Sequence, residues 1–158
     1  MSASFPGAAA GGGKVELKAW DTPFSDLRSP LVNLLTEYAT SSATIVVEPI
    51  SVDRYPKYLV RFSAVYAFMS EEEGGGTADI VNTTDSSKLG SSCAWIWVDS
   101  PHSAGYESWG EMRLRGGSGP IVHYLIFGID NNVGVVAGDV PSIERVDGPR
   151  SLDLNYQL

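Results

Sequence analysis

Cysteine is almost missing from this chain, since Cys93 is the only one among 158 residues. A single thiol excludes an intrachain disulfide and any metal site built from several cysteines. Free cysteine is among the most buried residue types, and no basic residue flanks Cys93 to activate its thiol. We therefore expect Cys93 to be a small core residue in a protein that works in a reducing compartment.

Positive charge is also scarce: 11 Lys and Arg residues stand against 19 Asp and Glu residues, which gives a net charge of −8. Binding to nucleic-acid phosphates or to anionic lipids depends on Lys and Arg side chains that displace counterions. The composition therefore predicts no nucleic-acid partner and no membrane partner. It favours a basic protein partner, which an acidic surface attracts.

Long hydrophobic runs are absent. The longest, residues 121–129, is interrupted by His123 and Gly128 and falls far short of the roughly 20 residues that cross a bilayer. Residues 1–13 lack the basic and apolar regions of a secretory signal, and their glycines favour a flexible tail. We expect a cytoplasmic protein with a Gly/Ala-rich tail over residues 1–13 and a single domain over residues 14–158.

One amphipathic helix is expected near the N-terminus. Ser29 and Pro30 form a helix-start signal, because serine caps helices and proline suits the first helical turn. The apolar residues Leu31, Leu34, Leu35 and Tyr38 follow at helical spacing, which places them on one stripe. The spacing predicts a helix over 30–40 that packs against a sheet.

The rest of the chain is typical of β-strands. Alternating or continuous apolar residues, bounded by turn residues, predict strands at 44–52, 58–68, 93–98, 109–114 and 143–146. The hairpin 121–137 turns at Asp130-Asn131-Asn132, whose residues tolerate tight turns. Together the elements predict an α+β domain, in which the N-terminal helix packs on a twisted, mainly antiparallel sheet of five to seven strands.

No group of residues has the spacing of a known catalytic or metal motif, so we assign no catalytic residue, no metal and no cofactor. A nucleophile site could combine Cys93 or Ser100 with His123 and a carboxylate from Asp99 or Asp130, because attack needs a base and an orienting group. Paired carboxylates are a further possibility, with candidates Asp99, Glu107, Glu111 and Asp130. A structural histidine and a turn-capping Ser100 are the favoured interpretations.

Two groups of residues are candidates for binding. Acidic and aromatic side chains that could contact a basic partner are Glu71, Glu72, Glu73, Tyr106 and Trp109, since desolvated aromatics dominate many interfaces. An aromatic-lined ligand cleft could form near Trp97, His102 and His123.

The order of several pieces resembles a pattern in small bacterial proteins. The pieces are Val60 to Phe68 with Glu71-Glu72, then Trp97-Val98-Asp99-Ser100, then His123 to Phe127 followed by Asp130, Val133, Val135 to Ala137 and Pro141. The resemblance covers 58–144. It implies an α+β domain of unknown function, related forms of which are similar to immunity proteins of bacterial toxin systems, and it carries over no catalytic residue.

The leading hypothesis is a non-enzymatic cytoplasmic protein-interaction domain, in one form a toxin-neutralising immunity protein. The alternative is a small-molecule-binding protein or hydrolase that uses the cleft near His102 and His123. A third hypothesis is self-association through an exposed strand near Ile143.

Overall fold

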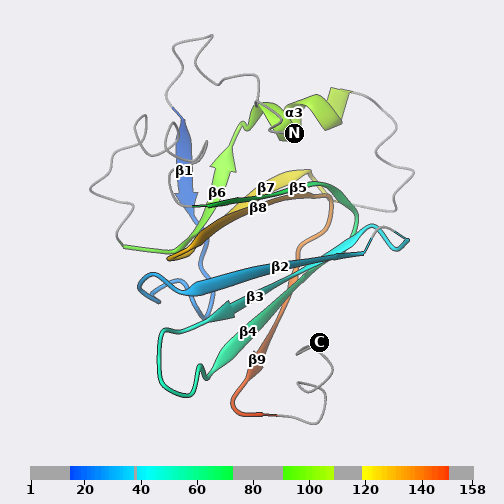
Figure 1. The fold of residues 1–158 in the computed structure, drawn as a ribbon. Coiled ribbons are helices and arrows are strands. Elements are labelled where there is room, and N and C mark those ends of the chain that lie inside the picture. Colours follow the sequence, from blue (N-terminus) through cyan, green and yellow to red (C-terminus); the bar gives the residue numbers. More distant parts are fainter. Residues whose placement is uncertain (1–14, 38, 73–90, 109–118, 150–158) are drawn as a thin grey trace.

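Two antiparallel β-sheets form the framework of the described residues in a computed structural model, which describes residues 15–37, 39–72, 91–108 and 119–149 (Figure 1). The five-stranded sheet has the order β1 (Glu16–Ala19), β6 (Ala94–Val98), β7 (Val122–Phe127), β8 (Asn131–Ala137) and β5 (Val65–Glu72). The four-stranded sheet has the order β2 (Leu31–Glu37), β3 (Ser42–Glu48), β4 (Lys57–Phe62) and β9 (Ser142–Val146). One helix, α3 (Pro101–Ser108), completes the described elements.

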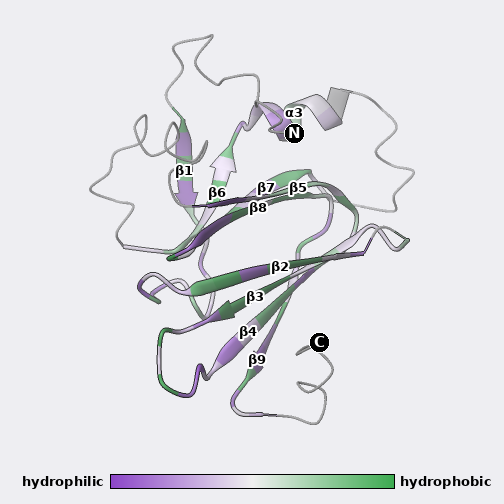
Figure 2. Cartoon of the chain, in the orientation of Figure 1, coloured by the Kyte–Doolittle hydropathy of each residue, from purple (hydrophilic) through white to green (hydrophobic). Residues whose placement is uncertain are grey.

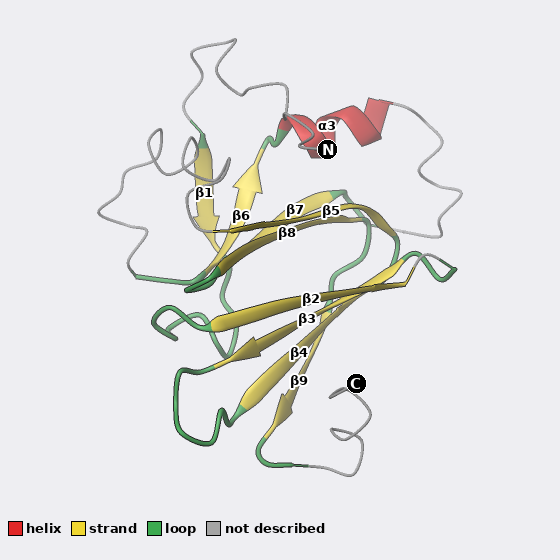
Figure 3. Cartoon of the chain, in the orientation of Figure 1, coloured by secondary structure: helices red, strands yellow, loops and turns green. Residues whose placement is uncertain are grey.

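The α+β prediction is therefore wrong. The described part of the chain is a mainly β fold of two stacked sheets with nine strands, and its one short helix lies over the outer side of the five-stranded sheet (Figure 3). Among the described residues, no helix precedes α3, so the predicted N-terminal helix does not form. The predicted tail over residues 1–13 and the strand predicted at 109–114 lie outside the described residues.

The segment predicted as a helix at 30–40 forms strand β2 instead. It pairs antiparallel with β3 along its whole length, from Leu31 opposite Glu48 to Glu37 opposite Ser42. Val32 is buried in the core while Leu35 is 43% exposed, which is the alternation of a strand. A short run of leucines fits a helical stripe and a strand face equally well. Pairing with β3 favours the strand conformation here.

The segment 58–68, predicted as one strand, belongs to two strands in different sheets. Strand β4 ends at Phe62, and the chain turns at Ser63 and Ala64 into β5 of the opposite sheet. Ala64 takes a positive φ of 49° at this corner, a conformation that permits a sharp turn at some cost in strain. The burial pattern shifts at this corner, because Ala64 and Val65 are both buried whereas Tyr66 and Phe68 are only partly covered.

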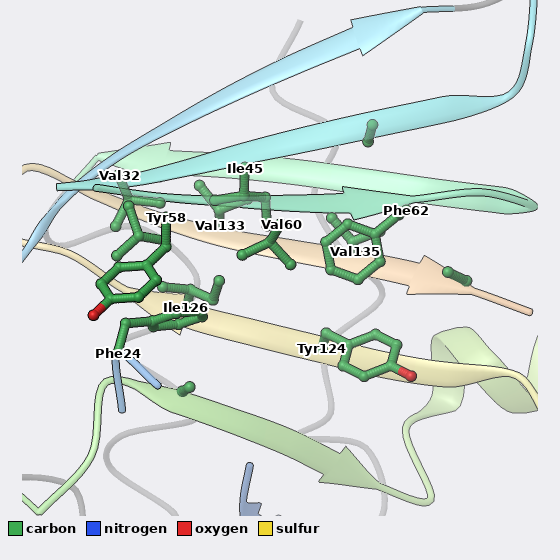
Figure 4. Packing of buried hydrophobic residues seen from close by; sticks show 14 of the residues in the cluster. Phe24, Val32, Ile45, Tyr58, Val60, Phe62, Tyr124, Ile126, Val133 and Val135 are labelled. Atoms are coloured by element: carbon green, nitrogen blue, oxygen red, sulfur yellow. The ribbon is translucent and has the colours of Figure 1, made fainter. Parts of the chain in front are cut away.

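The main core fills the space between the two sheets. Hydrophobic residues recur along the strands of both sheets (Figure 2), and their buried side chains meet between the layers (Figure 4). Phe62 of the four-stranded sheet contacts Tyr124 of the five-stranded sheet, with ring centroids 5.3 Å apart. The ring centroid of Trp20, the residue after β1, lies 4.8 Å from that of Tyr124. Such aromatic pairs add about 0.5–1.5 kcal/mol each beyond the area that they bury.

A second, smaller cluster lies on the other face of the five-stranded sheet. Trp95, Trp97 and Leu125 are buried there, with Leu17 and Phe127 packed against them. The alternation along β7 separates the two layers, since Tyr124 and Ile126 point into the main core and their neighbours point outward. Trp95 and Trp97 thus share one face of β6. The central strands β6, β7 and β8 of this sheet are therefore covered on both faces.

Several other sequence predictions are confirmed. The hairpin 121–137 forms as β7 and β8, the strand at 93–98 forms as β6, and the short terminal edge at 143–146 forms as β9. The strand predicted at 44–52 forms as β3, an inner strand of its sheet, which ends before Pro49.

The turn between β7 and β8 contacts the start of β2 in the other sheet. The backbone N–H of Ile129 donates to the carbonyl of Pro30 at 2.9 Å, so this turn joins the two sheets. A Cβ added at Gly128 would lie 2.6 Å from the Asn131 carbonyl oxygen and 2.8 Å from that of Pro30. Gly128→Ala should therefore lower the free energy of unfolding by about 1–3 kcal/mol.

Chemical denaturation of the variant measures this loss. Gly148→Ala is the matched control, because a Cβ there meets nothing within 4 Å. Equal stability of the two variants would show that the turn does not touch β2 as described.

Candidate functional site

Ser100 lies where strand β6 gives way to helix α3. Asp99, with a positive φ of 53°, turns the chain out of the strand. Ser100 then caps the helix: its Oγ accepts the backbone N–H of His102 at 3.2 Å, and its carbonyl accepts the N–H of Ala104 at 3.0 Å. Pro101 takes the first helical position, which suits a residue without an N–H. The Ser-Pro pair thus starts the one helix among the described residues, and the sequence analysis missed it.

His123 forms the second half of the site. It stands directly opposite Trp97 in the pairing of β6 with β7, and the two rings stack with centroids 5.1 Å apart. Its Nδ1 lies 2.7 Å from the Oγ of Ser100. Both side chains are fully buried, at 0% exposure. Strand β7 therefore places an imidazole within hydrogen-bond distance of the serine that caps helix α3.

The third ring of the group belongs to His102 of α3, which contacts the rings of Trp97 and His123. Its ring lies 5.7 Å from Trp97 and 5.5 Å from His123, centroid to centroid, edge-on to both. The structure thus brings together the three residues of the predicted ligand cleft, Trp97, His102 and His123, with Ser100 as a fourth member. Their use in ligand binding stays a prediction.

Burial controls the charge of this group. Desolvation, with a smaller contribution from charge repulsion by the neighbouring His102, lowers the pKa of His123 to about 3. Desolvation also lowers the pKa of His102. Both imidazoles are therefore neutral at pH 7, as expected when burial disfavours the charged form of the ring.

The second ring nitrogen of His123, Nε2, is buried, and no residue of the described ranges forms a hydrogen bond with it. It points toward strand β8, 3.0 Å from where a Cβ would stand on Gly134, with Met69 of β5 beside it. Because Gly134 has no side chain, the imidazole of His123 can pack directly against β8.

The chemistry open to this pair is limited. A serine nucleophile needs access to substrate and a base that a third group orients. Here Ser100 is buried and already caps a helix, and the proposed orienting acids, Asp99 and Asp130, are both exposed. The contact joins α3 to the sheet, in agreement with the structural interpretations of His123 and Ser100.

Cys93 is buried, as predicted, and its Sγ donates to the carbonyl of Phe24 at 3.3 Å. Burial raises the pKa of this thiol to about 11, so it stays protonated at neutral pH. Among the residues with described positions, no three His, Cys, Asp or Glu side chains gather closely enough to hold a metal ion.

The predicted partner-binding residues fall in two groups. Glu71 and Glu72 are the last residues of β5. Tyr106 of α3 packs on Tyr66 of β5, with ring centroids 5.6 Å apart and planes at 31°. Glu73 and Trp109 lie outside the described residues.

Strand β5 holds two residues that the sequence analysis did not assign to binding. Tyr66 is half-buried beside Tyr106, and Phe68 is 39% exposed. A signal for them exists in the sequence, because a strand that ends in consecutive glutamates is typical of a sheet edge, where alternate side chains reach the surface.

Comparisons with protein-family models, with curated proteins and with solved structures find no match to this chain. The resemblance of residues 58–144 to small bacterial proteins therefore stays a prediction. Within the described ranges, no helix has the length and apolar content needed to cross a membrane.

The neutral, buried His123 predicts a pH dependence of stability. The unfolded chain binds a proton on this residue below its ordinary pKa of 6.5, whereas the folded protein resists protonation down to about pH 3. The free energy of unfolding should therefore be highest above pH 6.5 and fall as the pH drops toward 3, by up to about 1.4 kcal/mol per pH unit for this group.

Denaturation curves between pH 7.5 and 4 test this slope. We expect His123→Asn to flatten it and His102→Gln to flatten it less, because His102 is only half-buried. An unchanged slope in His123→Asn would mean that His123 titrates normally in the folded protein.

Proposed function

We propose that this protein is an interaction domain that binds a basic protein partner through one edge of its five-stranded sheet. The surface that would make the contact, which we call the β5 surface, consists of Tyr66, Phe68, Glu71 and Glu72 of β5 with Tyr106 of α3. One observation carries the proposal: a single edge strand presents aromatic rings at one end and two carboxylates at the other.

The aromatic end supplies the apolar contact area. The rings of Tyr66 and Tyr106 support each other and are only half-buried, while Phe68 is substantially exposed. Tyrosine offers a large, rigid contact area with a polar tip, and such residues supply much of the binding energy at protein interfaces.

The acidic end gives the surface its charge. Glu71 and Glu72 stand opposite Asn132 and Asn131 of β8, and the exposed Asp130 follows in the same direction. The tyrosines and the glutamates are separated by roughly 16–20 Å along the strand, a span that fits within one standard protein interface.

The distribution of charge over the two sheets also favours this edge. The four-stranded sheet carries basic residues that are paired with acids: Lys57 with Glu48 at 3.3 Å and Arg61 with Glu144 at 2.7 Å. The strands of the five-stranded sheet contain Glu16, Lys18, Glu71 and Glu72, so their charges sum to −2. With a net charge of −8 on the whole chain, electrostatic steering favours a basic partner at the five-stranded sheet.

Two finer statements belong to the same proposal. We place the protein in the cytoplasm, because its lone buried thiol suits a reducing compartment. The basic partner would be a toxin that the domain neutralises, as the resemblance of residues 58–144 implies.

Affinity capture from the source cell, at low and at moderate salt, tests the main proposal. Wild-type protein should retain a basic protein, and Glu71→Lys combined with Glu72→Lys should reduce the retained amount about tenfold through charge repulsion. The matched control changes Glu16 and Asp21 to lysine, which alters the net charge equally near the opposite edge of the sheet.

Two outcomes would contradict the proposal. One is that no protein is retained at either salt concentration. The other is that the control variant loses the partner as completely as the β5 variant does, since binding would then depend on net charge alone.

A second candidate function, a small-molecule-binding protein or hydrolase, is supported by one observation. Ser100 Oγ and His123 Nδ1 lie 2.7 Å apart, which is the distance between a nucleophile and its base. The packing around them supports a structural role, so His123→Ala should lower the free energy of unfolding by about 2–4 kcal/mol, through a cavity beside Trp97 and the loss of the buried hydrogen bond to Ser100. A variant of unchanged stability that has lost ligand binding or hydrolysis would favour the second candidate.

A further inference from the structure

The two sheets have four edge strands, and three of them are protected against pairing with another chain. β1 is four residues long and contains Glu16 and Lys18, and β9 contains Glu144 and Arg145. β5 ends in Glu71 and Glu72. Charged residues and short length are the usual means by which proteins prevent edge-to-edge association.

Strand β2 lacks this protection. Its seven residues, Leu31–Glu37, include no proline and no Lys or Arg, and their only charge is at the last position. No strand of the described residues lies beyond it in the four-stranded sheet. Asn33, Leu35, Thr36 and Glu37 are all exposed.

The hydrogen bonds at the start of β2 show which backbone groups point out of the sheet. The carbonyl of Pro30 accepts the N–H of Ile129 at 2.9 Å, and the carbonyl of Val32 accepts the Nδ2 of Asn131 at 3.5 Å. Both carbonyls thus point away from β3. Because outward and inward groups alternate in an antiparallel ladder, the N–H and C=O groups of Leu34 and Thr36 also point outward.

The turn between β7 and β8 limits the free edge. It occupies the positions beside Pro30 and Val32 and leaves residues 33–37 open. A partner strand must therefore be short, or it would collide with the turn.

We propose that the free edge of β2 pairs with the same edge of a second copy of this chain, antiparallel and centred on Leu35. In this register Leu34 faces Thr36 of the second copy and exchanges two backbone hydrogen bonds with it, and the symmetric pair forms two more. Leu35 faces its own counterpart, so the pairing covers a side chain that is 43% exposed in the single chain.

Self-pairing fits this edge better than an unrelated strand does, for two reasons. The end of β2 at Glu37 falls opposite Asn33, which is the last open position before the turn, so its length matches the free edge. The register also places Glu37 opposite Asn33 of the other copy and not opposite a second glutamate, which avoids repulsion between like charges.

The charge of the surrounding sheet permits close approach of two copies. The strands of the four-stranded sheet contain three acidic residues, Glu37, Glu48 and Glu144, and three basic residues, Lys57, Arg61 and Arg145. Two acidic chains therefore meet at a sheet whose strands have balanced charge.

A disulfide trap tests the register directly. Leu35→Cys places two thiols at a close, non-hydrogen-bonded position across the two-fold axis, where a disulfide forms readily. Glu37→Cys is the matched control, because the two copies of residue 37 are four positions out of register. Under mild oxidation we expect Leu35→Cys to form the covalent dimer about tenfold faster than Glu37→Cys; the native Cys93 is buried and does not interfere.

Sedimentation over a wide concentration range gives the second measurement. Leu35→Lys should weaken the dimer about tenfold, whereas Ile50→Lys, at another exposed apolar residue, should leave it unchanged. Equal crosslinking of the two cysteine variants, a chain that stays monomeric at every concentration, or a dimer that survives Leu35→Lys would each overturn the proposal.

Discussion

The packing of two apolar sheet faces against each other is the interaction on which the rest of this structure depends. Phe62, Tyr124 and Trp20 contact one another between the sheets, and the chain crosses from one sheet to the other at Ala64 to place them there. The five-stranded sheet then covers its second face with Trp95, Trp97 and Leu125. A strand that is buried on both faces leaves little space for a reactive group with access to solvent.

This double coverage explains the Ser100–His123 pair. Strand alternation sends Tyr124 into the main core and His123 into the outer layer, where Trp97 stacks on it. A polar ring in such a layer needs a hydrogen bond, because an unpaired buried group costs free energy. The Oγ of Ser100 and Nδ1 of His123 form one, and the same Oγ caps α3. The pair resembles part of a catalytic site in its distance, but burial keeps the imidazole neutral and closes it to substrates.

The sequence predicted the local β elements better than it predicted the architecture. The hairpin of β7 and β8 was identified because its turn residues and alternation agree, and burial of Cys93 followed from its type. The two Ser-Pro pairs show why the rest failed. Ser29-Pro30 was interpreted as a helix start but precedes strand β2, whereas Ser100-Pro101 does start a helix. The same local signal gave opposite results, since pairing with β3 outweighs helix propensity in the first case. The contact of Ser100 with His123, 23 residues apart in the sequence, depends on the pairing of β6 with β7, which no local pattern encodes.

The central claim is that the outer face of the five-stranded sheet is a second buried layer, in which His123 has a structural role. The most direct measurement is an NMR titration of the His123 imidazole nitrogens. The structure predicts a neutral ring that keeps a single tautomer from pH 8 down to about pH 4, because burial lowers its pKa to about 3. A titration midpoint near 6.5 would contradict the claim, because it would show an imidazole in contact with solvent and available for chemistry.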